Sequence, residues 1–263
     1  DVWCQGFSEP EHGSDLGSAQ TRAVCDGDHY VINGQKIWTT MGNFAKYMIL
    51  LARTNPDAAR KYDGLSYFLA PMHVPGIEAR PIRKITGEYG FTETFFTDAR
   101  IPADCLMGEE GQGWKIAMQT LQYERGAEAG AAGGLMMVRV TIDDLVEQIR
   151  DVCRDGEPVL QDPVMRDQLV RLIMEEKALA LGDKRAHIAA LTTDYPHSLP
   201  LSHKLRGTEM SRRMRQFAIN LQGAAGALYV GDAQARQGGF WQRAYFNSFS
   251  ATIGGGTSQV QTN

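Results

Sequence analysis

The spacing of apolar residues changes once along this chain of 263 residues, close to Ile101-Pro102, and this change limits the fold most. Before it, short apolar runs are separated by turn signals such as Asp26-Gly27-Asp28. After it, apolar residues recur at helical intervals. The pattern predicts an α+β fold in two domains. An antiparallel, β-barrel-like domain is expected at 1–103, and a four-helix-type helical bundle, truncated at its end, at 104–263.

The element boundaries follow from the apolar runs and the breaks between them. Strands are predicted at 2–4, 23–25, 30–32, 47–51, 65–69, 77–85 and 94–97, with an exposed loop at 55–64. Helices are predicted at 113–150, 162–190 and 202–223, because apolar residues recur there with helical period and Asp162-Pro163 is a typical helix start. The tail from 238 to 263 is predicted to be rich in loops.

Composition excludes several classes of protein. The net charge of −4 gives neither a basic nucleic-acid surface nor an acidic tail. The longest apolar runs fall short of the ~20 residues that span a bilayer. The four cysteines and six histidines are scattered without metal-type spacing, so no metal site is predicted. We expect free thiols and a cytoplasmic protein, although a mitochondrial matrix location also fits. Both ends look cut, as in a piece of a longer protein.

Two runs combine strand-like apolar residues with hydroxyls, an indole and a glycine-rich turn. The first is Trp3 to Asp15, which contains Ser8-Glu9-Pro10, and the second is Asn33 to Thr40, which contains Trp38-Thr39-Thr40. Each run alone is an ordinary polar turn or a buried tryptophan. Together they provide groups that cover a flat heteroaromatic ring and form hydrogen bonds to its edge. The pair therefore predicts a ligand site.

These runs resemble the flavin-binding segments of the acyl-CoA dehydrogenase family. The resemblance covers the family's middle and C-terminal domains, without its N-terminal helical domain. It implies FAD as cofactor and an acyl-CoA thioester as substrate. It also implies that Ser8 bonds the pyrimidine part of the flavin, that Trp38 covers the ring, and that Thr40 bonds near N5. The cofactor-binding residues implied in these runs are Gln5, Phe7, Ser8, Ser14, Trp38, Thr39 and Thr40.

The segment Gly254 to Gln261 resembles the family's C-terminal signature, with one departure. Many members place there the glutamate that removes the α proton, but this chain has Gly255, which retains only a backbone N–H. Other members place the glutamate on the first helix of the C-terminal domain, before an arginine. The resemblance then implies Glu124 as the base, with Gly255 supplying its N–H to the thioester. Substrate contacts are implied for Ser14, Tyr123, Arg125 and Gly256.

A second group of cofactor contacts is implied between subunits. Asn220 to Ala224 resembles a Gln-x-x-Gly-Gly stretch that meets the flavin of a neighbouring subunit, with Asn for Gln and Ala for the second Gly. The family's Arg-x-x-Phe-Gly motif is not recognisable near Arg150, Arg154 and Gly156. The resemblance implies Asn220, Gly223 and Ala224 for these contacts, and Thr257 and Gln259 for contacts with the adenosine part of the cofactor. A homodimer or homotetramer is expected.

The function expected from the resemblance is dehydrogenation of an acyl-CoA to the trans-2-enoyl-CoA, in fatty acid or other lipid metabolism. Glu124 would take the α proton, flavin N5 would accept the β hydride, and an electron-transfer flavoprotein or similar acceptor would reoxidise the cofactor. Two alternatives stay open. One is an acyl-CoA oxidase or flavin monooxygenase of the same fold, and the other is a catalytically silent subunit of a heteromeric complex. The sequence does not select the acyl group.

Overall fold

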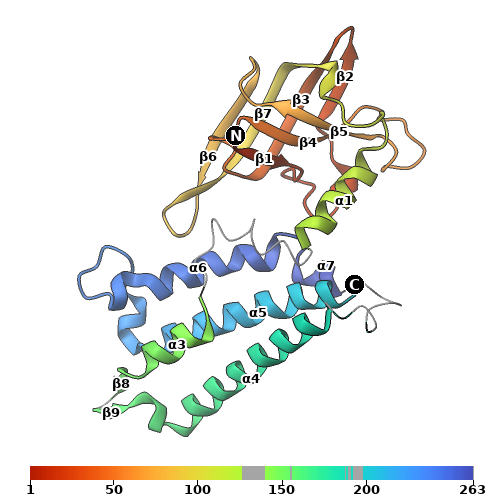
Figure 1. The fold of residues 1–263 in the computed structure, drawn as a ribbon. Helices are drawn as coiled ribbons and strands as arrows, with labels where there is room; N and C mark the ends of the chain where they lie inside the picture. Colours follow the sequence, from red (N-terminus) through yellow and green to blue (C-terminus); the bar gives the residue numbers. More distant parts are fainter. Residues whose placement is uncertain (126–139, 155, 187, 189–190, 192–197, 263) are drawn as a thin grey trace. The chain divides into compact units, whose positions relative to one another are not determined.

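The computed structural model describes residues 1–125, 140–154, 156–186, 188, 191 and 198–262. The chain forms two compact units, 1–122 and 123–263. The first contains a curled β-sheet and the second is helical (Figure 1). The predicted fold class, a sheet domain followed by a helical domain, is confirmed.

The sheet unit contains seven strands. They are β1 (Trp3–Gly6), β2 (Arg22–Asp26), β3 (His29–Thr40), β4 (Tyr47–Arg53), β5 (Leu65–Pro71), β6 (Ile77–Arg83) and β7 (Tyr89–Pro102). Their order is β1-β4-β2-β3-β7-β6, with β5 also paired to β4. The expectation of a wholly antiparallel sheet is wrong, because β1 and β4 run parallel. Apolar alternation identifies a strand but carries no information about the direction of its partner.

The β2–β3 hairpin forms where the sequence predicts it. Asp26 pairs with His29, and Gly27 in the turn has a φ of 67°, a conformation that costs glycine little. One face of the sheet covers a core that includes Ile32, Met48 and Phe68, all fully buried. This core gives β3 and β4 fixed positions.

A second core covers the segment that follows β1. Helix α1 (Gly113–Arg125) packs Ala117 against a cluster that contains Phe7, Leu51 and Tyr67. Short 3-10 turns η1 (Leu16–Ser18) and η2 (Ala103–Cys105) complete the unit. Because Phe7 is part of this core, the loop carrying Ser8 starts from a rigid point.

The helical unit is built on α5. Its helices are α3 (Ile142–Ile149), α4 (Pro163–Ala186), α5 (Ser198–Leu221), α6 (Phe240–Ile253) and the short α7 (Ser258–Thr262). Helix α5 lies between α4 and α6 (Figure 1). Its core centres on Leu145, Met214 and Trp241, all nearly fully buried. A short β8–β9 hairpin (Cys153–Arg154, Glu157–Pro158) and the 3-10 turns η4 (Val159–Gln161), η6 (Gly223–Ala227) and η7 (Arg236–Gly239) connect the helices.

Two expectations for the helical half are wrong. A continuous helix at 113–150 is excluded, because Val140 and Thr141 are not helical and α3 starts anew after Thr141. Thr141 and Asp144 form a capping box there, a signal that was present in the sequence. The tail is also not rich in loops, since α6 occupies 14 of its residues. Helix α6 is stabilised by burial of Trp241 and Ala244 in the bundle, which local sequence preference does not reveal.

Candidate active site

A buried ion pair joins the two predicted flavin runs. Lys36 Nζ on β3 lies 2.8 Å from Glu9 Oε1 and 3.0 Å from the carbonyl oxygen of Phe7, and it is inaccessible to solvent. The Glu9 carboxylate also accepts the backbone N–H groups of Gln20 and Thr21, at 2.6 and 2.8 Å. The Ile37 N–H donates to Ser8 O at 2.9 Å. Residues far apart in sequence are thereby held as one surface.

Charge and burial act against each other within this pair. Burial alone would raise the pKa of Glu9, but the Lys36 charge and three hydrogen-bond donors outweigh it, so that the pKa of Glu9 is lowered. Burial lowers the pKa of Lys36 to about 8, although the charge of Glu9 opposes this. Both groups are therefore charged at neutral pH, and each is the counter-ion that the other needs.

Trp38 stands on a strained bulge of β3. Its φ is 60°, and the β3–β7 register shifts between Lys36 and Thr39. A non-glycine residue in the left-handed region costs about 1–3 kcal/mol and is found most often at functional sites. Trp38 is 57% exposed, and its ring is nearly perpendicular to that of Phe91, with 6.1 Å between the ring centroids. The bulge therefore presents a large flat aromatic surface instead of burying it.

The other predicted residues of the sheet unit differ in exposure. Gln5 and Ser8 are half-buried, whereas Ser14 and Thr40 are exposed. Thr39 is fully buried, and its Oγ1 has no hydrogen-bond partner in the described part of the chain. Phe7 is buried in the core, so it supports the loop. Thr40 is exposed two residues after Trp38, and half-buried Ser8 is bonded through its carbonyl to Ile37, the residue before Trp38.

The candidate base lies at the end of a described helix. Tyr123, Glu124 and Arg125 are the last three residues of α1. The prediction that Glu124 stands on a helix agrees with this backbone. The positions of these three side chains lie outside what the structure describes, so the roles of Tyr123, Glu124 and Arg125 stay predictions.

The glycine turn that follows α6 is held by side chains from two helices. Gly255 and Gly256 have φ values of 66° and 94°. Gln261 Nε2 donates to Gly255 O at 3.0 Å, and Lys204 Nζ on α5 donates to Gly256 O. The Thr257 side chain accepts the Val260 N–H at 3.2 Å, and Gln259 is exposed. Thr257 therefore caps α7, and the turn has one defined shape.

The predicted second-subunit contacts lie at the end of α5. Asn220 Oδ1 accepts Gln216 Nε2 at 3.0 Å, and Arg154 Nη2 donates to Asn220 O at 3.2 Å. Gly223 has a φ of 58°, where the chain leaves the helix, and Ala224 follows it in η6. The structure therefore brings the β8 arginine to the Asn220–Ala224 segment.

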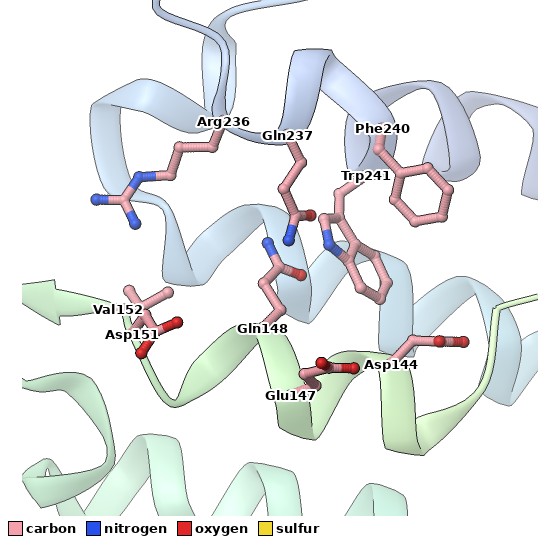
Figure 2. Close-up of a pocket in the computed structure, with 9 residues that line it drawn as sticks. All are labelled: Asp144, Glu147, Gln148, Asp151, Val152, Arg236, Gln237, Phe240 and Trp241. Carbon is pink, nitrogen blue, oxygen red and sulfur yellow. The ribbon is translucent and has the colours of Figure 1, made fainter.

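A cavity of about 610 Å³ opens between α3 and the start of α6 (Figure 2). Its lining combines the carboxylates of Glu147 and Asp151 with Arg236, Phe240 and Trp241. The Trp241 indole N–H has no hydrogen-bond partner among the described residues. The cavity lies at the first turn of α6, about 20 Å along the helix from the glycine turn. It contains none of the predicted site residues.

Sequence reasoning missed four residues of these sites: Glu9, Lys36, Lys204 and Gln261. The sequence did contain a hint for Lys36. It is separated from the buried Tyr30 and Ile32 by an even number of residues, and side chains at such spacing along a strand point to the same face. A lysine at an inward strand position calls for a buried carboxylate. The contacts of Lys204 and Gln261 with the glycine turn had no such signal. Among the described residues, there is no cluster of His, Cys, Asp and Glu suited to a metal ion, and no helix could cross a membrane.

Comparison with known proteins supports the resemblance. The acyl-CoA dehydrogenase middle domain matches residues 4–99, and the acyl-CoA dehydrogenase C-terminal domain matches 111–263. The chain is 36% identical to the acyl-CoA dehydrogenase IpdE1 of Mycobacterium tuberculosis, over the whole chain and 65% of that protein. It is 32% identical to the human mitochondrial short-chain specific acyl-CoA dehydrogenase, over 99% of the chain and 61% of that protein. The chain thus spans just under two thirds of the length of these relatives.

Solved structures give the same result for the fold. A structure described as the Tcur3481-Tcur3483 steroid ACAD superposes with a TM-score of 0.84 at 31% identity, over 99% of this chain and 65% of that one. The ChsE4-ChsE5 complex of Mycobacterium tuberculosis gives 0.82 at 28% identity, over 99% and 66%. With both domain models matched along almost the whole sequence, this chain belongs to the acyl-CoA dehydrogenase family.

Proposed function

We propose that the protein oxidises an acyl-CoA to the trans-2-enoyl-CoA with FAD as cofactor. The observation that carries the proposal is the joining of the two flavin runs by Glu9 and Lys36, which fixes an exposed indole beside accessible hydroxyls. These groups fit a flavin, because the indole can cover a flat ring while Ser8 and Thr40 bond its edge. FAD, when bound, would accept the β hydride at N5.

In the proposed reaction the chain's own residues handle the proton and the developing charge. The Glu124 carboxylate removes the α proton while the β hydrogen leaves with its electron pair, and the Cα–Cβ double bond forms. The Gly255 N–H donates a hydrogen bond to the thioester oxygen, on which negative charge develops. Trp38 and the loop around Ser8 exclude water from the reacting face.

The test is the Glu124→Gln variant of the full-length protein, purified with its flavin. We expect anaerobic reduction of the flavin by acyl-CoA to slow at least about a hundredfold, because a positioned base contributes 10²–10⁴. Glu147→Gln is the matched control, since it removes an exposed helix carboxylate from α3. Unchanged reduction in Glu124→Gln at full flavin occupancy would exclude Glu124 as the base. Rapid peroxide formation without an acceptor would favour the oxidase or monooxygenase alternative.

A second candidate is a subunit of a heteromeric complex. Two similar structures are described by pairs of chain names, Tcur3481-Tcur3483 and ChsE4-ChsE5. Two sequence features also support this candidate. Gly255 replaces the usual base, and the Asn220–Ala224 segment departs from the family's pattern. A protein that stays colourless with added FAD, but gains flavin when co-expressed with a homologous chain, would support this candidate. A homodimer or homotetramer, electron transfer to an electron-transfer flavoprotein, and a cytoplasmic location remain parts of the first proposal.

A further inference from the structure

Lys204 lies beside the position from which the usual family base is absent. We infer that Lys204 is a positioning residue for the thioester: it fixes the glycine turn and places its ammonium charge next to residue 255. This inference rests on the proposed function, because it assigns a role to Lys204 only if a thioester oxygen meets the Gly255 N–H. It also explains in physical terms why a carboxylate at 255 would be a poor base in this chain.

The geometry around Gly255 shows how near the lysine is. A Cβ atom built at Gly255 would lie 3.8 Å from Lys204 Cε, with no other heavy atom of the described residues inside 4 Å apart from those of Gly254 to Gly256. Lys204 is half-buried on α5, and its Nζ donates to the carbonyl oxygen of Gly256. A side chain at 255 would therefore begin in van der Waals contact with the lysine stem and within reach of its charge.

In the turn, the carbonyl groups of Gly255 and Gly256 accept hydrogen bonds, and the Gly254 N–H donates to Ser250 O at 2.8 Å. Gln261 binds Gly255 O, and Lys204 binds Gly256 O. In the part of the chain that the structure describes, the N–H of Gly255 makes no hydrogen bond. Ser258 also donates to Glu209 Oε1 on α5 at 2.7 Å, which fastens the start of α7 to the same helix. A donor presented in this way suits an oxygen that gains negative charge.

The ammonium group would lower the pKa of two acids, with opposite consequences for the reaction. A thioester enolate formed near Gly255 would be stabilised by the positive charge, so the α proton would become more acidic. A glutamate at 255 would also be stabilised as carboxylate, which lowers its pKa and weakens it as a base. With the base elsewhere, the lysine stabilises the enolate without weakening the base.

The first experiment measures the acidity of the bound ligand. The probe is 3-thiabutyryl-CoA, whose β sulfur blocks hydride loss while its enolate gives a long-wavelength charge-transfer band with oxidised flavin. In Lys204→Met of the full-length, flavin-loaded protein, we expect the apparent pKa for appearance of this band to rise by at least one unit. Lys204→Arg should restore most of the shift. Lys184→Met, which removes an exposed lysine of α4, should leave the pKa unchanged.

An apparent pKa in Lys204→Met within 0.3 units of the parent would overturn the inference. This result is distinct from failure of the proposed function. If Glu124→Gln reduces its flavin at the normal rate, the base assignment fails, whereas the ligand pKa still reports on Lys204. If the protein binds no flavin and gives no charge-transfer band, both the proposed function and the inference about Lys204 are rejected.

A second experiment introduces a carboxylate at residue 255, where many family members have their base. In Glu124→Gln/Gly255→Glu, the acid limb of the pH profile for flavin reduction reports the pKa of the new base. We expect this limb to move up by at least one pH unit when Lys204→Met is added, because the counter-charge has gone. Backbone strain at 255 is common to both variants, so it does not affect the comparison. Identical acid limbs would count against the inference.

Discussion

A charged residue inside a strand shapes the candidate flavin surface. Lys36 is fully buried, and its contacts with Phe7 O and Glu9 connect β3 to the loop after β1. The alternation of residues along β3 predicts that the Lys36 side chain points inward. The identity of its partner could not, because Glu9 lies 27 residues away and several acidic residues were available.

The destabilising effects of removing the two members of this pair should not be additive. Glu9→Gln or Lys36→Met should each cost about 3–5 kcal/mol of unfolding free energy, because a buried charge loses its counter-ion. The double variant should cost less than the sum of the two. Urea unfolding of the purified protein measures these changes. Asp63→Asn, which breaks the exposed pair with Arg60, should leave the midpoint unchanged. Additive effects in the double variant would contradict a direct interaction.

The pH dependence of stability should carry the signature of Glu9. Its pKa is lowered from the ordinary 4.5 in the folded state. Its contribution is therefore fully present above about pH 4.5 and is lost as the pH falls through the lowered folded value. Thermal unfolding between pH 3 and 6 should show a shallower acid slope in Glu9→Gln than in the parent. Equal slopes would show that Glu9 has the same pKa in both states.

We expect Trp38 to lower the stability of the flavin-free protein while it strengthens flavin binding. Trp38→Gly removes the left-handed strain, so the melting temperature of the flavin-free protein should not fall below that of the parent. Flavin content should nevertheless drop sharply, because the ring that covers the cofactor is absent. Trp38→Phe should retain part of the flavin. Absorbance at 450 nm of the purified protein measures the occupancy, and full occupancy in Trp38→Gly would exclude the proposed ring contact.

At the scale of elements, local sequence motifs determine where some helices and strands begin, and tertiary packing determines where others begin. The β2–β3 hairpin follows from Gly27 at the turn. Helix α3 follows from the Thr141–Asp144 capping box, a local signal that a single long helical pattern concealed. Helix α6 has no comparable local start, since its N-cap Gly239 makes no side-chain hydrogen bond. It exists because Trp241 and Ala244 are buried against the bundle.

The capping box gives a prediction for α3. Thr141→Ala removes the side chain that accepts the Asp144 N–H, and should cost about 1 kcal/mol. Thr252→Ala is the matched control, because its hydroxyl bonds only a carbonyl within α6. Chemical denaturation of the two variants checks the difference. Equal midpoints would mean that α3 starts independently of this cap.

At the scale of the molecule, the two candidate functions predict different assemblies. In the first proposal, the full-length protein expressed alone should have a mass of two or four chains and one flavin per chain. Native mass spectrometry together with flavin absorbance measures both quantities. A flavin-free product that acquires mass and colour only with a homologous chain would instead favour the heteromeric subunit.

The sequence by itself determined the order of a sheet domain and a helical domain, the hairpin, and the two runs that form the candidate flavin surface. These features depend on the spacing of apolar residues and on the residue types at turns, both of which are local properties of the sequence. Only the tertiary structure decided that Lys36 pairs with Glu9, that β1 runs parallel to β4, and that Lys204 meets a turn 52 residues away. Such contacts depend on how distant segments pack, and no local pattern encodes which side chains then become neighbours.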